Sequence, residues 1–292
     1  MLLARHCSAQ EPARRPDSLH VKRLTAVVVT EGTLYLSSLA GLYYAWYRDY
    51  PQSSFHLFND TREWMQVDKC GHGISAYYIS RIGYSGYRWS GLSENRSAWL
   101  GGLLGFAYLL NIEILDGFSA GWGFSVGDLT ANTLGCLAFT GQQLAWHEQR
   151  IVLKYSFHPT GYAGYRSDLL GKNLIQEMVK DYNGHSYWLS ANIASFLPRG
   201  AKFPKWLNVA FGYGAEGMTG AMENPASVNG TALPAFTRYR QFYLSLDADL
   251  TRIPVHSKLI KGIFTVIGFI KLPAPALEYN SRGQFRFHPF YF

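Results

Sequence analysis

Three pairs of polar residues occur at helical spacing in otherwise apolar stretches of the sequence. The pairs are Asp68 with His72, Glu113 with Asp116, and Asp128 with Asn132. Residues three or four positions apart lie on one face of a helix. An unpaired buried carboxylate is costly, so such groups are protonated, paired or bound to a cation. We therefore expect these pairs to meet inside a helical bundle and to form one polar cluster.

Two interpretations of this cluster are open. In the first, it binds a divalent metal or a substrate, as inward-facing carboxylates and histidines of helical bundles do; the metal ligands would then be Asp68, His72, Glu113 and Asp116. In the second, it is a buried polar network in which His72 and Lys69 balance the acids and Asn132 supplies amide donors. No catalytic residue is assigned, because no nucleophile elbow, His-Glu-x-x-His motif or P-loop is present. A divalent metal is the only cofactor under consideration.

Helices have to position these pairs, and the pattern is helical from about residue 24 to residue 197. The predicted helices are Leu24–Tyr47, Asn59 or Asp60 to Ile82, Ala98–Asp116, Ser125 to about Glu148, and Tyr165–Asp181. Ser125 has Asp128 three positions later, which is the spacing of a capping box. The segment Tyr84–Asn95 is predicted to be a connection, and Gly135 is a position where another helix could approach closely.

From about Trp206 the periodicity changes toward two, which is typical of strands. The predicted strands are Leu207–Met218, Arg238–Leu250, Leu277–Tyr279 and Gln284–Phe292, with a hairpin turn at residues 280–283 and an apolar helix Ser257–Phe269. The sequence thus predicts an α+β fold, with an N-terminal helical bundle and a C-terminal small antiparallel β-sheet. The expected domains are 24–197 and 198–292, preceded by a disordered terminus or signal-peptide remnant at 1–23.

The composition excludes several classes of protein. Of the 292 residues, 48% are apolar, 16% are aromatic and 16% are charged, with a net charge of +7. Soluble domains average about 25% charged residues. Intrinsic disorder, collagen, coiled coils and disulfide-stapled miniproteins are excluded, and the basic residues are too scattered to predict a nucleic-acid partner. Cys7, Cys70 and Cys136 form no Cys-x-x-Cys motif, and pairing of Cys70 with Cys136 stays open.

The apolar stretches predict contact with a membrane. Leu24–Tyr47 is the strongest candidate, although it contains Glu31, and Leu129–Trp146 has eighteen uncharged residues, just the length of a spanning helix. A buried bundle core explains the second stretch as well as lipid does. The alternating C-terminus, residues 285–292, resembles the terminal strand of outer-membrane proteins, although an edge strand that covers a core is the favoured interpretation.

Three motifs together resemble a known family. They are Asp68-Lys69-Cys70-Gly71-His72, the segment Glu113–Gly117, and the segment Trp122–Asn132. They resemble an uncharacterised family of predicted periplasmic lipoproteins of Gram-negative bacteria and, more distantly, VanZ-like membrane proteins. The resemblance implies a cell-envelope location, in the periplasm or at the outer membrane, and no established activity. The residues before Cys7 do not form a lipobox.

The leading hypothesis is therefore a non-catalytic envelope protein that binds a lipid, a small ligand or a protein partner. One alternative is a metal-dependent hydrolase that uses the Asp/His/Glu/Asp cluster. Another is a structural subunit of an outer-membrane complex.

Overall fold

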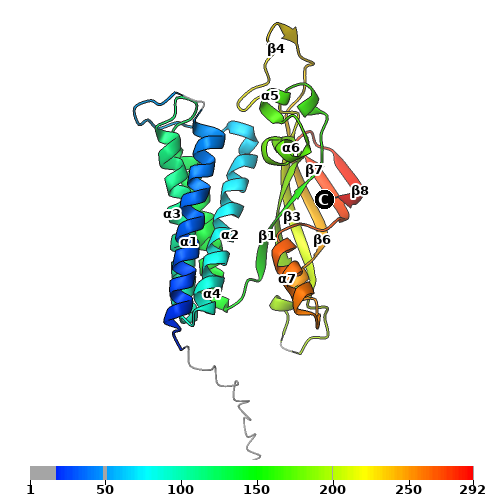
Figure 1. Cartoon of the computed structure of the whole chain (residues 1–292). Helices are drawn as coiled ribbons and strands as arrows, with labels where there is room; N and C mark the ends of the chain where they lie inside the picture. Colours follow the sequence, from blue (N-terminus) through cyan, green and yellow to red (C-terminus); the bar gives the residue numbers. More distant parts are fainter. Residues whose placement is uncertain (1–17, 49–50, 199, 292) are drawn as a thin grey trace, which may run out of the picture.

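The computed structural model describes residues 18–48, 51–198 and 200–291. Four N-terminal helices form a bundle that stands beside a C-terminal antiparallel sheet (Figure 1). This arrangement confirms the predicted α+β class. Cys7 and residues 1–17 of the predicted terminal segment lie outside the described residues, and the first helix begins at Val21.

The bundle is built around its second helix, which packs against each of the other three. Its helices are α1 (Val21–Leu42), continued by a π-helical turn Tyr43–Tyr47, then α2 (Val67–Trp89), α3 (Glu94–Gly117) and α4 (Val126–Trp146). The predicted close approach at Gly135 is confirmed, because a Cβ placed there would lie 2.1 Å from the carbonyl oxygen of Gly73 on α2. The predicted cap is confirmed as well, since the Ser125 hydroxyl accepts a hydrogen bond from the Asp128 amide at 2.9 Å.

Two predicted boundaries around α2 are wrong. The helix does not begin at Asn59 or Asp60, because Trp64, Met65 and Gln66 have left-handed backbone angles and interrupt it. Tertiary contacts cause this break: the Trp64 amide donates to the Ala221 carbonyl at 2.9 Å, and the Trp64 ring is buried. The predicted connection Tyr84–Asn95 is mostly helical, because α2 continues to Trp89 and α3 begins at Glu94.

Six antiparallel strands form the main sheet, in the order β1-β2-β3-β6-β7-β8. Their bounds are β1 (Ile151–Phe157), β2 (His185–Asn192), β3 (Leu207–Glu216), β6 (Tyr239–Ala248), β7 (Ala274–Asn280) and β8 (Phe285–Tyr291), while β4 (Ser227–Val228) and β5 (Thr231–Ala232) form a separate hairpin. The predicted turn at residues 280–283 joins β7 and β8, and Gly283 supplies its positive φ of 76°.

The change from helix to strand occurs earlier than the periodicity predicts. Strands β1 and β2 precede Trp206 and lie in the part of the chain expected to be helical. The predicted amphipathic helix Tyr165–Asp181 is also broken, into a short turn, α5 (Ser167–Leu170) and α6 (Leu174–Lys180). Gly171 ends α5 with a φ of 117°, a backbone conformation that a continuous helix does not allow.

The two faces of the sheet have opposite polarity. Alternate residues of β6, from Tyr239 to Asp247, are buried, and Phe242, Leu244 and Leu246 between them are exposed. On the outer face, directly paired positions of five strands form an apolar line, which we call the outer row: Leu189, Phe211, Leu244, Leu277 and Phe287. Each of these side chains is between 43% and 63% exposed. The inner face instead buries polar residues: Lys154, Ser190, Gln241, Ser245, Asp247 and Glu278.

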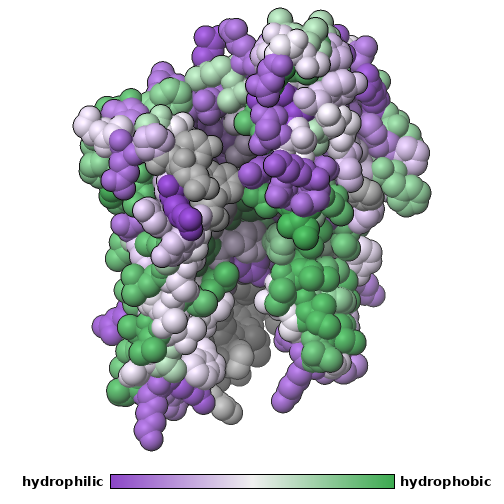
Figure 2. Space-filling view, turned by 45° about the horizontal axis from the view of Figure 1, so that its top comes forward, coloured by the Kyte–Doolittle hydropathy of each residue, from purple (hydrophilic) through white to green (hydrophobic). Residues whose placement is uncertain are grey.

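Helix α7 (Lys258–Ile267) lies beside the sheet at the end away from α5 and β4 (Figure 1). The predicted apolar helix is confirmed, and the Ser257 hydroxyl accepts from the Ile260 amide at its start. Leu259 and Val266 on α7 are 73% and 72% exposed. Figure 2 shows hydrophobic residues gathered over the lower part of the half of the molecule that carries α7. Hydrophilic residues predominate toward the opposite end.

The bundle and the sheet are joined at that hydrophilic end. Trp64 and Val67, before and at the start of α2, belong to one hydrophobic core with Ala215 and Met218 at the end of β3. Two helices, α1 and α3, are long and apolar enough to cross a membrane by length and composition. Whether residues 24–47 or 129–146 span a membrane stays a prediction.

Candidate functional site

A polar cluster occupies the end of the bundle where α2 and α4 begin. We call it the bundle-end cluster. Its members come from the loop before α2 and from α2, α3 and α4: Asp60, Asp68, Lys69, His72, Glu113, Asp128 and Asn132. Five of the six residues predicted from the sequence therefore meet. Helix α3 contributes from its last turns, whereas α2 and α4 contribute from their first, because α3 runs antiparallel to both (Figure 1).

One half of the cluster is organised around the Lys69 ammonium group. Its Nζ lies 2.6 Å from Asp60 Oδ2, 3.0 Å from Asp68 Oδ2 and 2.7 Å from Asp128 Oδ1. Ser125 donates a hydrogen bond to Asp60 at 2.5 Å. Lys69 is therefore the cation that holds three carboxyl groups together, while Asp68 Oδ1 is buried and finds no hydrogen-bond donor among the described residues.

The other half contains His72 and Glu113. Asn132 Nδ2 donates to Glu113 Oε1 at 3.2 Å, so the Asn132 carbonyl oxygen faces His72 and accepts from its Nδ1 at 3.2 Å. With the proton on Nδ1, the neutral imidazole has its lone pair on Nε2. That atom lies 3.7 Å from Asp128 Oδ1. Two atoms that both accept hydrogen bonds thus face each other, which favours a proton or a cation between them.

Burial controls the protonation of this cluster. Burial, together with the hydrogen-bonded Asp60, raises the pKa of Asp128 to about 8. Burial also disfavours the charge on Asp60, but hydrogen bonds from Asp128, Lys69 and Ser125 outweigh it and hold the pKa of Asp60 below its usual range. The pair therefore shares one proton near neutral pH. Burial, with the nearby Lys69 charge, lowers the pKa of His72 to about 4, which keeps the imidazole neutral.

Two triads of the cluster have the spacing of metal ligands. In His72, Glu113 and Asp128, and again in Asp60, Asp68 and Asp128, one ligand atom of each residue lies within 4.8 Å of the others. The Lys69 ammonium contacts all three members of the second triad, and through Asp128 Oδ1 it also contacts one member of the first. The first triad has a neutral imidazole, two carboxyl oxygens and no lysine or arginine within ion-pair distance of Glu113 among the described residues. Such N/O ligands suit a divalent cation, and the 27% exposure of the His72 side chain gives a route from solvent.

Asp116 lies apart from the triads. It accepts a hydrogen bond from the Tyr47 hydroxyl at 2.8 Å, at the end of the π-helical turn after α1. The predicted ligand set contained Asp116, whereas the first triad contains Asp128. Asp116 is excluded from the triad because it lies one helical turn beyond Glu113, on the side of α3 that faces Tyr47. The sequence predicts Asp60 only as a possible start of a helix, and its role beside Lys69 depends on the left-handed turn at residues 64–66, which no spacing rule indicates.

Cys70 and Cys136, whose pairing the sequence left open, do not form a disulfide. Cys70 and Cys136 are free thiols, and Cys136 lies in the bundle core with Ala76 and Leu109. The bundle is therefore held together without a disulfide between α2 and α4.

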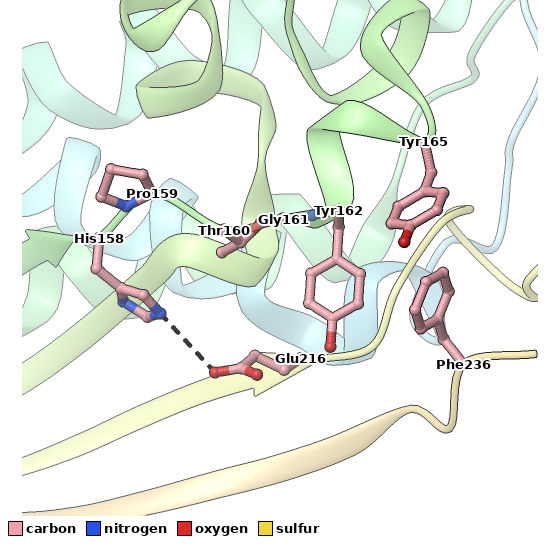
Figure 3. Close-up of a pocket in the computed structure, with 8 residues that line it drawn as sticks. All are labelled: His158, Pro159, Thr160, Gly161, Tyr162, Tyr165, Glu216 and Phe236. Carbon is pink, nitrogen blue, oxygen red and sulfur yellow. Dashed lines mark hydrogen bonds and ion pairs between the residues drawn. The ribbon is translucent and has the colours of Figure 1, made fainter. Parts of the chain in front are cut away.

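A second site, which the sequence did not indicate, is a cavity of about 400 Å³ beside the ends of β1 and β3. We call it the β1–β3 pocket. Figure 3 shows the rings of His158 and Tyr162 pointing toward Glu216, with Tyr165 and Phe236 on the far side of the Tyr162 ring. His158 Nε2 lies 3.8 Å from Glu216 Oε1. The pocket is at the same hydrophilic end of the molecule as the bundle-end cluster. Glu216 is the last residue of β3, and the other pocket residues come from the connections that follow β1 and precede β6, which carry no motif.

The comparisons with known proteins concern the bundle. Residues 57–141 match the family described as "Predicted periplasmic lipoprotein", a domain of unknown function. This match covers under a third of the chain, but it contains every member of the bundle-end cluster. It supports a cell-envelope location, and the resemblance to VanZ-like proteins stays a prediction. No curated protein and no solved structure matches the chain.

Proposed function

We propose that the protein is a non-catalytic, lipid-binding component of the cell envelope that contacts a membrane through the outer face of its sheet. The observation that carries this proposal is the outer row, in which Leu244 is flanked by Phe211 and Leu277 in direct register. A sheet that turns apolar side chains outward and polar ones inward has the pattern of strands that face lipid.

The energetics of the exposed row favour such contact. Burying a Leu or Phe side chain fully is worth about 1.5–3 kcal/mol, so each half-exposed member of the row would gain roughly 1 kcal/mol in lipid. A contiguous apolar patch of this kind marks an interaction surface and is rare on monomeric soluble proteins. The inner face cannot exchange roles with it, because Lys154 and Asp247 are already paired there at 2.7 Å.

Apolar side chains are also exposed outside the sheet. Helix α7 exposes Leu259 and Val266, and α1 exposes Val29 and Leu36 at 61% and 69%. Lys258 and Lys261 belong to α7 and are exposed, which suits the anionic surface of a phospholipid membrane. The outer membrane is the membrane we propose, and the family description of residues 57–141 supports the coarser location in the cell envelope.

Flotation with vesicles of phosphatidylethanolamine and phosphatidylglycerol tests this proposal. The wild-type chain is expected to float with the vesicles, and the double variant Leu244→Asp, Leu277→Asp is expected to stay at the bottom of the gradient. Met222→Asp is the matched control, because Met222 is 41% exposed but lies outside the sheet. Equal flotation of the wild type and the double variant would refute the proposal. The proposal would also be refuted if the wild-type chain did not bind vesicles but co-purified with an envelope protein that the double variant lost. That result would indicate a structural subunit.

A second candidate function is divalent-cation binding by His72, Glu113 and Asp128. Their spacing and the free Nε2 of His72 favour it over a purely structural network. These ligands would leave coordination positions open for water, as a metal-dependent hydrolase requires. Metal analysis of the purified chain decides this candidate: a stoichiometric divalent ion that is lost in His72→Ala would support it, and no bound ion at neutral pH would exclude it.

A further inference from the structure

The β1–β3 pocket combines aromatic walls with one acidic group. Phe236 packs edge-on against both Tyr162 and Tyr165, with ring centroids 5.1 Å apart in each pair. These rings form a continuous wall, and His158 and Thr160 complete the cavity on the opposite side (Figure 3). A volume of about 400 Å³ lies in the range of small-molecule sites.

Glu216 is the charged group of this cavity, and its neighbours hold it ionised. Its Oε2 accepts from the Tyr239 hydroxyl at 2.7 Å, and its Oε1 accepts from Gln241 Nε2 at 3.1 Å. Burial opposes the charge, but these hydrogen bonds and His158 outweigh it and lower the pKa of Glu216. The carboxylate is therefore negative at neutral pH.

The charge of Glu216 has little compensation from the protein. In the described part of the chain, its ion-pair partner is His158 at 3.8 Å, which carries a charge only when protonated. The guanidinium of Arg282 stacks over the ring of Tyr239, the residue that donates to Glu216, at 4.1 Å. The side chain of Glu216 is 22% exposed, so the carboxylate is within reach of a molecule in the cavity.

We propose that the β1–β3 pocket binds the ammonium group of a small organic cation. Aromatic faces attract cations through the quadrupoles of their rings, and a quaternary ammonium group in an aromatic cage is the established use of this interaction. The carboxylate supplies the opposite charge. Two sources offer this chemistry: a free amine such as choline or ethanolamine, and the headgroup of a phospholipid. The proposal is independent of lipid contact by the outer row, because it rests on the pocket alone.

Calorimetric titration of the full chain in a maltoside detergent tests the proposal, with choline and its neutral carbon isostere dimethylbutanol as ligands. Choline is expected to bind with saturation and at least about tenfold more tightly than the isostere, which corresponds to about 1.4 kcal/mol. Equal binding of the two, or binding of neither, would overturn the proposal. Tighter binding of a neutral sugar such as glucose would also overturn it.

The comparison of choline with dimethylbutanol needs only the wild-type chain. Variants then show whether the binding takes place in the β1–β3 pocket. Glu216→Gln is expected to remove the preference for choline over the isostere, and Tyr162→Leu is expected to weaken choline binding several-fold. Asp168→Asn is the matched control, because this nearby acid has a side chain that is 64% exposed outside the pocket. A preference that survives Glu216→Gln in a folded variant would refute the assignment to this pocket.

A third ligand distinguishes the two sources. Tighter binding of dihexanoylphosphatidylcholine than of choline would assign the site to a lipid headgroup. Tighter binding of choline would assign it to a free amine. Both results support an ammonium site.

Discussion

The inner face of the sheet and the bundle-end cluster both bury charged side chains, but they balance the charges differently. On the sheet, Lys154 lies 2.7 Å from Asp247, and His288 lies 2.8 Å from Glu278. In the bundle, one lysine and one neutral histidine face four carboxyl groups, those of Asp60, Asp68, Glu113 and Asp128. Burial of charged groups by itself therefore does not indicate a cation site. An excess of acidic over basic groups does.

The two regions agree in what they turn outward. Leu134 and Leu137 on α4 are 61% and 53% exposed, in the same range as the outer row of the sheet. Both halves therefore bury polar groups beside their hydrophobic cores and expose large apolar side chains, which is unusual for a soluble domain. The comparison therefore favours lipid contact for both halves and a divalent metal ion for the bundle only.

The largest effect is expected from breaking a balanced pair. Lys154→Met leaves the Asp247 carboxylate buried without its cation, which should destabilise the fold by about 3–5 kcal/mol. Thermal unfolding of the detergent-solubilised chain measures this effect, with Lys258→Met on the exposed face of α7 as the control. A change no larger than that of the control would mean that the sheet does not need its pair.

The next effect separates the bundle-end cluster from the inner face of the sheet. Because the cluster has an excess of carboxyl groups, a divalent cation should raise its stability. A divalent ion at one hundred times its Kd should stabilise the wild-type chain by about 2.7 kcal/mol, and His72→Ala should abolish this response. Lys154→Met should keep the response, since the sheet takes no part in it. Melting curves with Zn²⁺ or Mn²⁺ and with a chelator measure the difference; equal responses of wild type and His72→Ala would contradict the contrast.

A smaller effect tests whether Asp116 is separate from the cluster. Tyr47→Phe removes the hydroxyl that donates to Asp116 at 2.8 Å. A hydrogen bond to a charged group contributes about 1.5 kcal/mol or more, so a loss of about that size is expected. The stabilisation by divalent cation should be unchanged in this variant. A weaker cation response would place Asp116 among the ligands after all.

The last effect is gradual, because it is a pH dependence on the inner face. Burial lowers the pKa of Lys271 to about 8, below the value of 10.5 for a free lysine. Between these values the unfolded chain binds more protons, so the contribution of Lys271 to the free energy of unfolding rises with pH from about 8 to 10.5. The stability difference between wild type and Lys271→Met should therefore shift in favour of wild type over this window. A difference that is constant with pH would contradict it.

The sequence predicted those features that depend on local patterns. Ser125 and Asp128 have the spacing of a cap, Gly135 has the size that a close helix crossing needs, and the alternation in β6 separates its two faces. The meeting of five of the six paired residues was also predictable, because helical spacing and the cost of unpaired carboxylates both lead to it.

Long-range contacts decide the features that the sequence did not predict. The left-handed turn at Trp64 exists because that residue bonds to Ala221, 157 positions later. This turn brings Asp60 back to Lys69. Likewise, β1 is a strand because β2 pairs with it along its length. The β1–β3 pocket forms from the end of β3 and from connecting segments that meet only in the folded chain.

The most direct test of lipid contact uses a fluorescent probe on a single introduced cysteine, after replacement of Cys7, Cys70 and Cys136 by serine. A probe at Leu244→Cys lies in the middle of the outer row, and a probe at Met222→Cys lies at the hydrophilic end. In vesicles with brominated acyl chains, the account predicts strong quenching at position 244 and none at position 222. Equal quenching at both positions, or none at position 244, would contradict it.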